Sequence, residues 1–437
     1  MDGEHYPPVV RAAIEHISSR IPDCVVIGAA LLGGREKLAL DGSFDIGVPV
    51  VDGNTPEDAM RAAMARFAPE LVLDLSDQPV VDLRVRMNLV TLALLSGVAY
   101  QGADFRFDPP PRPRVATKPS VAVIGTGKRT GKTAVSAHLA RLLAARGTPP
   151  VIVAMGRGGP AEPELVDPTT FDLSPKGLVE LALSGRHAAS DHLEDALTAG
   201  VVTIGTRRCG GGMAGAPADS TFADGVVLAN SRPEGLLVLE GSGQAIPPVH
   251  ADATIFVVPD TGLAPLTEGL GPYRLLLSDV VVIIMTNATF ADTGAADLEA
   301  SVRGVAPGVR VARIELRPFP LEPVSGRTVF YITTAPASAI DLMAAHLERE
   351  HGCKVVGTSA HLAHRPKLAE DLERAGEAEV VLVELKAAAV DLAARFALER
   401  GLEVVFCDNR VASLGGDGSF DELALATTDL AIERHNS

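Results

Sequence analysis

The stretch Val121–Thr133, VAVIGTGKRTGKT, constrains the fold more than any other part of the chain. A short run of β-branched residues ends in glycines, and a helical pattern then covers Ala134–Arg146. A strand, a glycine-rich loop and a helix in this order aim backbone N–H groups and the positive end of the helix at one place, where they bind phosphate. We therefore predict that Lys132 reaches the β- and γ-phosphates of a nucleotide, and that the Thr133 hydroxyl holds Mg²⁺.

The expected nucleotide site extends beyond these two residues. Lys128 and Arg129 lie inside the loop, where they can neutralise charge on the γ-phosphate or on an acceptor. Asn287 follows an apolar strand, and its amide could read the base, with a simple turn as the alternative. The predicted nucleotide-binding residues are Gly127, Lys128, Arg129, Thr130, Gly131, Lys132, Thr133, Ala134 and Asn287.

Composition limits the class of partner and the compartment. The net charge of −16 over 437 residues disfavours nucleic acid and anionic membranes as partners. The four cysteines are far apart, and we interpret them as reduced thiols without a zinc site. No apolar run reaches the about 18 residues of a membrane span, and the N-terminus shows no signal core. These features predict a cytoplasmic protein.

Alternating strand and helix patterns predict α/β architecture throughout. We expect an N-terminal α/β domain over residues 1–115, with strands at 24–28, 71–75 and 98–101 and helices at 55–67 and 81–96. A P-loop NTPase domain with a mostly parallel, doubly wound sheet is expected over 116–325, with strands at 121–125, 151–155, 201–205, 236–240, 254–258 and 280–286. A C-terminal α/β domain is expected over 326–437, with strands near 327–333, 379–385 and 403–407.

Three further segments place polar residues at the carboxyl ends of predicted strands, where open α/β sheets collect ligands. Glu240 ends an apolar strand, and we predict that it holds Mg²⁺ together with Thr133. One glycine-rich loop carries Arg157, and a second one carries Arg207 and Arg208. Because arginine binds phosphate through two N–H groups, the two loops suggest a second phosphorylated ligand; exposed arginines in flexible loops are the alternative. Glu164 and Asp167 could add a metal contact.

Four motifs together carry a resemblance. Gly125–Thr133 begins with Gly-Thr and ends with Gly-Lys-Thr, which resembles dethiobiotin synthetase and its ATP-dependent relatives. With Met155–Pro160, Gly205–Met213 and Leu239–Gly243, the chain resembles the cyclic 2,3-diphosphoglycerate synthetase family over its whole length. The resemblance implies ATP-dependent closure of a phosphoanhydride within 2,3-bisphosphoglycerate, giving ADP and phosphate, and it implies Mg²⁺ and K⁺.

The implied roles follow from charge. Lys132 and the loop amides are expected to bind ATP, and the bisphosphate is expected to lie against Arg157, Arg207 and Arg208. Lys128 and Arg129 are expected to bridge toward the transferred group. Two alternatives stay open: a dethiobiotin synthetase-like ligase or kinase acting on another anionic small molecule, and a regulatory P-loop ATPase switch. Related nucleotide domains commonly pair, so we expect a homodimer.

Overall fold

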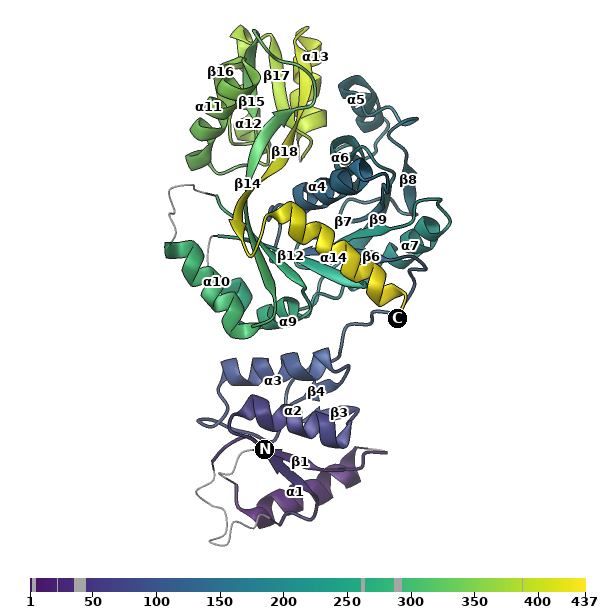
Figure 1. Cartoon of the computed structure of the whole chain (residues 1–437), viewed down its shortest axis with the longest axis vertical. Coiled ribbons are helices and arrows are strands. Elements are labelled where there is room, and N and C mark those ends of the chain that lie inside the picture. The colour runs from purple at the N-terminus through teal and green to yellow at the C-terminus, as the bar shows by residue number, and fades with distance from the viewer. Residues whose placement is uncertain (2–4, 22, 35–44, 261–263, 287–292, 387) are drawn as a thin grey trace. The chain divides into compact units, whose positions relative to one another are not determined.

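The computed structural model describes residues 1, 5–21, 23–34, 45–260, 264–286, 293–386 and 388–437 (Figure 1). These residues form two compact units. Unit 1 comprises residues 1–110 with 263–277, and unit 2 comprises 111–262 with 278–437. In the described part of the chain, no helix is long and apolar enough to cross a membrane.

Unit 1 contains short strands and the helices that cover them. Its described elements are α1 (Pro7–Arg20), β1 (Ala29–Leu31), β2 (Val50–Asp52), α2 (Pro56–Phe67), β3 (Leu71–Leu73), α3 (Leu83–Leu95), β4 (Ala99–Gln101), β5 (Arg106–Phe107), α8 (Ala264–Thr267) and α9 (Gly271–Leu276). The parallel pair β1–β2 and the group β3–β4–β5 are separate sheets. The helices predicted at 55–67 and 81–96 are confirmed as α2 and α3, and the Thr55 side chain caps α2 by accepting from Asp58 N–H.

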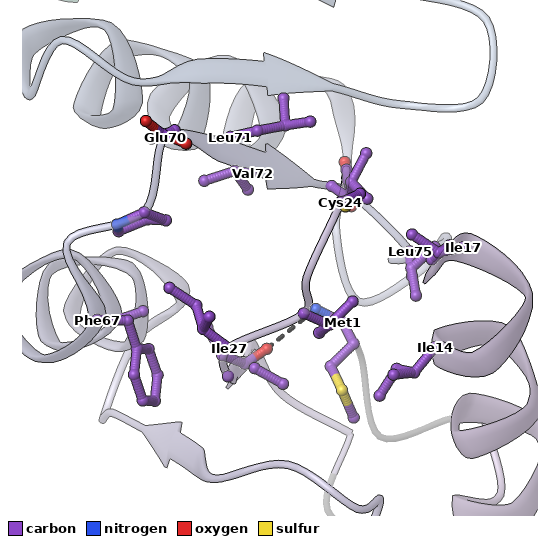
Figure 2. A pocket seen from close by; sticks show the side chains of 18 of the residues that line it. Met1, Ile14, Ile17, Cys24, Ile27, Phe67, Glu70, Leu71, Val72 and Leu75 are labelled. Carbon is purple, nitrogen blue, oxygen red and sulfur yellow. Dashed lines mark hydrogen bonds between the residues drawn. The ribbon is translucent and has the colours of Figure 1, made fainter. Parts of the chain in front are cut away.

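The strand predicted at residues 24–28 is wrong. These residues form no regular structure, and the pairing begins one step later, where Ala29 lies opposite Val50. A cavity of about 720 Å³ lies beside the segment and is lined by apolar side chains, including Ile17, Ile27 and Val72 (Figure 2). An apolar run predicts burial, but it does not say whether the backbone finds a neighbouring strand.

Unit 2 is built on one extended sheet. Its described elements up to residue 320 are β6 (Ser120–Gly125), α4 (Lys132–Ala145), β7 (Val151–Gly156), β8 (Glu164–Val166), α5 (Pro175–Leu183), α6 (Asp191–Ala199), β9 (Thr203–Cys209), β10 (Asp219–Ser220), α7 (Phe222–Asn230), β11 (Leu237–Glu240), β12 (Ala253–Pro259), β13 (Val280–Ile284), α10 (Thr293–Val305) and β14 (Arg310–Pro320). The strands follow the order β10-β9-β7-β11-β6-β12-β13-β14, with β8 beside β9. The predicted mostly parallel sheet is confirmed.

The remaining strands extend the same sheet. They are β15 (Thr328–Ile332), β16 (Lys354–Ser359), β17 (Val380–Glu384) and β18 (Glu403–Gly416), and the order continues β14-β18-β17-β15-β16. The helices are α11 (Ile340–His351), α12 (Arg365–Leu372), α13 (Arg395–Glu399) and α14 (Phe420–His435), with a π-helical turn at Ala389–Ala394 and 3₁₀ turns at Ala337–Ala339 and Ala375–Glu377. The antiparallel pair β14–β18 therefore joins the C-terminal strands to the phosphate-loop strands within one unit.

Helices cover both faces of the central strands. Val121 and Val123 of β6 share a core cluster with α4 and α14, through residues such as Leu139 and Phe420. Gly225 of α7 packs against the opposite face, since a Cβ there would lie 3.3 Å from Val153. Because successive side chains of a strand point to opposite faces, a strand covered on both sides needs apolar residues at nearly every position. This requirement explains the continuous apolar runs in the central strands of unit 2.

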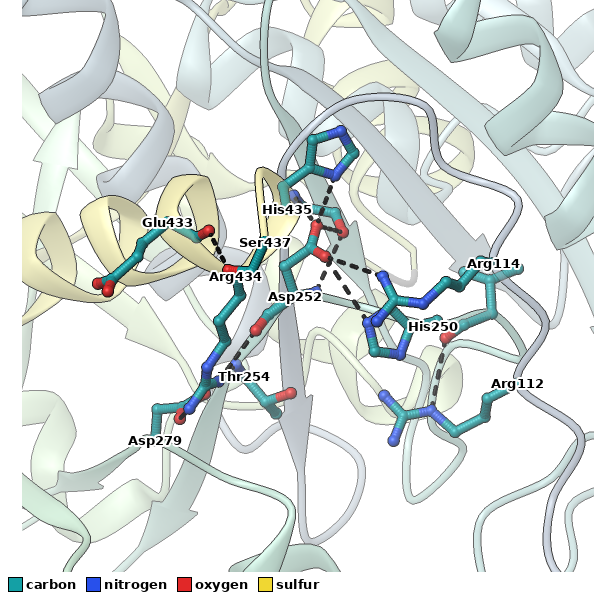
Figure 3. A network of polar contacts seen from close by, with 12 residues as sticks. Arg112, Arg114, His250, Asp252, Thr254, Asp279, Glu433, Arg434, His435 and Ser437 are labelled. Atoms are coloured by element: carbon teal, nitrogen blue, oxygen red, sulfur yellow. Dashed lines mark hydrogen bonds and ion pairs between the residues drawn. The ribbon is translucent and has the colours of Figure 1, made fainter. Parts of the chain in front are cut away.

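A buried network fixes the start of β6, at the edge opposite the phosphate loop (Figure 3). Asp252 is 5% exposed and accepts hydrogen bonds from the N–H and hydroxyl of Ser120, both at 2.9 Å. Arg114, His250 and His435 surround the same carboxylate at 3.4–3.7 Å. Since a buried carboxylate is tolerated only when it is paired, these contacts anchor the strand that carries the loop.

Candidate active site

The phosphate loop joins β6 to α4, as predicted, and its shape depends on glycine. Gly131 has φ +81°, and a Cβ there would lie 2.1 Å from the Cδ1 of Ile284. A Cβ on Gly125 would lie 2.6 Å from the Thr130 hydroxyl. Any larger residue at either position would therefore push the loop open. Thr126, the second residue of the Gly-Thr start, is buried without preventing the turn.

Lys132 lies inside the loop. Its ammonium donates to the Gly127 carbonyl at 2.7 Å and lies 3.4 Å from the Thr130 hydroxyl. The residue is only 7% exposed, and burial lowers the pKa of Lys132 to about 8. A buried ammonium that donates to its own loop is a strong donor for any phosphate oxygen that enters the loop.

Glu240 and Thr133 meet as predicted. Strand β11 lies between β7 and β6, so Glu240 emerges beside the loop, and its Oε1 accepts from the Thr133 hydroxyl at 2.9 Å. The other oxygen, Oε2, is buried without a hydrogen-bond partner among the described residues. Burial raises the pKa of Glu240. An unpaired buried carboxylate oxygen beside a threonine hydroxyl suits a hard cation such as Mg²⁺.

Helix α6 supplies carboxylates that the sequence analysis missed. Asp195 is fully buried, and neither of its oxygens has a hydrogen-bond partner in the described structure. Burial and the neighbouring Glu240 raise the pKa of Asp195 well above its ordinary value. Asp191 and Glu194 of the same helix act electrostatically on this pair. Acidic residues three and four apart on a partly apolar helix were the available signal.

The described residues contain no group of three histidine, cysteine or carboxylate side chains that could hold a metal ion by themselves. Mg²⁺ ordinarily takes one or two protein carboxylates and fills its octahedron with phosphate and water oxygens. Thr133, Glu240 and Asp195 therefore fit a cation that arrives with a nucleotide.

Glu164 and Asp167 are used elsewhere. Glu164 forms an ion pair with Arg186, and His192 lies 3.7 Å away. Asp167 accepts hydrogen bonds from Thr169 within its own turn. The structure therefore does not bring either residue to Glu240. Strand β8 runs antiparallel to β9 and holds Glu164 opposite Gly205 of that strand.

The Glu164 cluster predicts an acid-dependent contribution to stability. His192 and then Arg186 lower the pKa of Glu164 to about 2, although partial burial opposes them. Because this pKa is below the ordinary value of 4.5, the contribution should be complete above about pH 4.5 and should be lost as the pH falls toward 2. Glu164→Gln should therefore lower the free energy of unfolding by about 1 kcal/mol at pH 7, a value reduced for solvent screening.

Urea unfolding of the wild type and the variant across this pH range would measure the difference. Exposed Glu162 in the same turn region provides a matched control, Glu162→Gln, which removes no such ion pair. A Glu164→Gln difference that does not shrink in acid would contradict the assignment.

Three cations converge on a cavity of about 690 Å³ beside the loop. Lys128, Arg157 and Arg208 line it. A Cβ placed on Gly243 would lie 3.2 Å from Arg208 Nη2, 3.5 Å from Arg157 Nη2 and 3.9 Å from Lys128 Cγ. Because Gly243 has no side chain, the three cations can approach the same volume. The structure thus brings one residue from the phosphate loop and one from each arginine loop together.

The positive charge of this cavity is not neutralised. Arg208 donates to the carbonyl of Ser242 at 2.8 Å, and its Nε is buried without a partner in the described structure. Burial, and then repulsion from Arg157, lower the pKa of Arg208. Asp191 attracts Arg208 and opposes this shift, but no ion pair within 4.0 Å joins the three cations to a carboxylate of the described residues. A ligand with several negative charges would relieve this repulsion.

Two predicted cations lie elsewhere. Arg207 and Arg208 are neighbours on strand β9 and face opposite sides, so Arg208 is buried while Arg207 is exposed and does not line the cavity. Arg129, with φ +58°, lines a second cavity of about 340 Å³ together with Thr130, Gly131, Thr133 and Ala134. Asn287 falls outside the described residues, and Thr286 lines this second cavity.

Comparisons with known proteins cover nearly the whole chain. Three family models match: the N-terminal domain of cyclic 2,3-diphosphoglycerate synthetase over residues 1–108, its P-loop domain over 120–314 and its C-terminal domain over 320–410. The curated cyclic 2,3-diphosphoglycerate synthetase of Rubrobacter xylanophilus is 44% identical over 98% of this chain and 96% of its own. The synthetases of Thermococcus gammatolerans (45%, covering 95% and 93%) and Methanothermus fervidus (40%, covering 99% and 96%) are also similar.

Solved structures are similar at a much lower level, as one example illustrates. It is LpxK from Aquifex aeolicus in complex with ATP, which is 14% identical with a TM-score of 0.39 over 73% of this chain and 89% of that chain. A likeness this weak carries no weight for fold or function.

Proposed function

The chain belongs to the cyclic 2,3-diphosphoglycerate synthetase family, and we infer that it catalyses the ATP-dependent cyclisation of 2,3-bisphosphoglycerate. The observation that carries this inference is the position of the cavity lined by Lys128, Arg157 and Arg208. It holds three unneutralised cations and adjoins the phosphate loop at Gly127. Two phosphates on adjacent carbons are the kind of ligand that three converging cations attract most strongly.

The reaction needs two steps, and both are phosphoryl transfers. An oxygen of one substrate phosphate attacks the γ-phosphorus of ATP, and the bond to ADP breaks. An oxygen of the other substrate phosphate then attacks the phosphorus of the activated one, closing the phosphoanhydride and releasing inorganic phosphate. The protein has little covalent chemistry to perform, so catalysis depends mainly on positioning the reactants and neutralising their charge.

We assign roles by position. Lys132 and the amides of residues 127–134 bind the ATP phosphates, while Arg157 and Arg208 hold the bisphosphate. Lys128 lies between the two, at the point where the γ-phosphoryl group leaves the loop. Arg129, in the second cavity, faces the nucleotide, and Arg207 is left without a contact to either ligand. This assignment divides five of the six cations predicted from the sequence between two ligands and leaves Arg207 outside both.

Thr133 and Glu240 are the residues that would hold Mg²⁺, with Asp195 beside them. When bound, Mg²⁺ neutralises charge on the β- and γ-phosphates. The protein's contribution is to keep buried, unpaired oxygens facing this point, so that binding the cation also satisfies groups that are costly to leave unpaired.

Three finer points are proposals. K⁺ rests on the family resemblance, the homodimer on the pairing of related nucleotide domains, and the location on the sequence features described above. We propose that K⁺ is a second cation of the reaction, that the protein acts as a homodimer and that it works in the cytoplasm. Activity in K⁺ compared with Na⁺, and light scattering of the purified protein, would test the first two. The alternatives are less well supported. A switch ATPase does not need the arginine cavity, and a carboxylate- or amine-directed ligase does not need three cations there.

Phosphorus NMR tests the activity directly. With ATP, Mg²⁺, K⁺ and 2,3-bisphosphoglycerate, we expect a new upfield phosphoanhydride signal that grows together with ADP and inorganic phosphate. A reaction without 2,3-bisphosphoglycerate is the control, and it should consume ATP much more slowly. Loss of ATP at the same rate in both, with no new signal, would overturn the assignment of the substrate.

A further inference from the structure

Residues in and after the C-terminal strands of unit 2 help to line the second cavity, which adjoins the phosphate loop. The cavity of about 340 Å³ is lined on one side by loop residues and the start of α4, namely Arg129, Thr130, Gly131, Thr133 and Ala134. On the other side it is lined by Thr334, after β15, by Lys386, after β17, and by Asn409 of β18. Residues more than 200 positions after the loop therefore form part of the same site.

Lys386 is one of the cations on this side of the cavity. Its ammonium lies 3.2 Å from Glu194 Oε1 of helix α6, and it lines the cavity together with Thr133. The adjacent Glu384 is already satisfied, since it accepts from Thr333, Thr334 and Asn409. An ammonium has three N–H donors, and within the described residues Glu194 is the one acceptor in range.

The cavity lining places Lys386 beside the phosphate loop, and the charge interactions are consistent with that position. Lys386 and Arg208 both repel the ammonium of Lys132, which the loop holds where nucleotide phosphates bind. Although burial lowers it, the carboxylates of Glu194 and Glu384 raise the pKa of Lys386, so the side chain carries its charge at neutral pH. Lys386 therefore lines the cavity from the side opposite the loop residues Gly131 and Thr133, and its charge acts on the neighbouring loop lysine.

We propose that Lys386 is a catalytic residue that binds the phosphate chain of the nucleotide, turning its free N–H groups from the Glu194 ion pair to phosphate oxygens. The C-terminal α/β segment is then part of the ATP site. With the nucleotide bound, the ammonium bridges α6, the phosphate chain and the residues that follow β17. The identity of the reaction rests on the proposed function, but the phosphate contact depends only on the phosphate loop.

Lys386→Met tests the contact. Titration calorimetry with Mg²⁺ and adenylyl imidodiphosphate, a non-hydrolysable ATP analogue, should show at least tenfold weaker binding. Lys367→Met is the matched control, because Lys367 is an exposed lysine on α12 of the same segment and does not line the cavity. Binding to this control should stay within twofold of the wild type.

A structural role makes a different prediction. Lys386→Met leaves the carboxylate of Glu194 uncompensated, so it should also lower the melting temperature. The double variant Lys386→Met/Glu194→Gln removes the orphaned charge and should recover the melting temperature while nucleotide binding stays weak. Recovery of both would overturn the proposal and leave Lys386 as a counter-ion of Glu194.

The two proposals fail separately. If the protein does not cyclise the bisphosphate but Lys386→Met still weakens binding of the analogue, the activity is wrong and the role of Lys386 stands. If cyclisation proceeds and the Lys386 variants bind the analogue as tightly as the wild type, the role of Lys386 is wrong and the activity stands.

Discussion

Lys132→Ala should lower the rate of cyclisation by on the order of a thousandfold or more while leaving the fold intact. The lysine is the cation inside the phosphate loop, and phosphoryl transfer depends on charge neutralisation at that point. The variant removes a buried ammonium whose contacts are limited to the loop itself, so folding loses little. The same NMR assay gives the rate, and circular dichroism with thermal melting gives the state of the fold.

Lys176→Ala is the matched control, because Lys176 is an exposed lysine on helix α5 of the same unit. It should retain full activity. Wild-type turnover by Lys132→Ala would falsify the nucleotide assignment of the loop. Loss of activity together with loss of the folded signal would show instead that the loop contacts of Lys132 are needed for folding, contrary to our expectation.

Features that are contiguous in the sequence could be predicted, because their geometry is local. A strand, a glycine-rich loop and a helix form one site whatever surrounds them, so residues 121–133 were sufficient to predict it. Glu240 was predicted for a related reason. A polar residue that ends an apolar parallel strand lies at the same edge as the end of every neighbouring strand.

Contacts across elements could not be predicted in this way. Asp195 lies inside a helix, where an acidic residue usually faces solvent, and only the packing of α6 against the strands reveals that it is buried beside Glu240. Lys386 comes from a segment that was expected to form a separate domain. Strand β14 joins that segment to the sheet through Pro318 and Pro320. These prolines fit because β14 pairs with β13 only up to Ile314, so its last residues have one neighbouring strand.

The two adjacent arginines illustrate the limit most clearly. A loop composition of Thr206-Arg207-Arg208-Cys209 indicates anion binding, but it does not say which side chain faces the ligand. Residue 207 is still part of strand β9, so the alternation of the strand sends Arg207 outward and Arg208 into the cavity. A one-residue difference in where the strand ends would exchange their roles.

This alternation yields the second large prediction. Arg208→Ala should lower kcat/KM for 2,3-bisphosphoglycerate by about a hundredfold, which corresponds to about 2.8 kcal/mol, mainly through a higher KM. Arg208 is a buried guanidinium with an unpaired Nε in a cavity that it shares with Arg157 and Lys128. The KM for ATP should change much less, because the nucleotide phosphates are held by the loop.

Arg207→Ala is the control that the chain itself provides. It removes the same side chain from the next position of the same strand, but from the exposed face, so kinetics should stay within about twofold of the wild type. Equal losses in the two variants would show that both arginines act through the fold of the loop. A loss confined to Arg207→Ala would reverse the assignment and place the substrate on the other face of β9. The contrast between neighbours therefore locates the bisphosphate more sharply than either variant alone, since the residue type and the charge removed are the same in both.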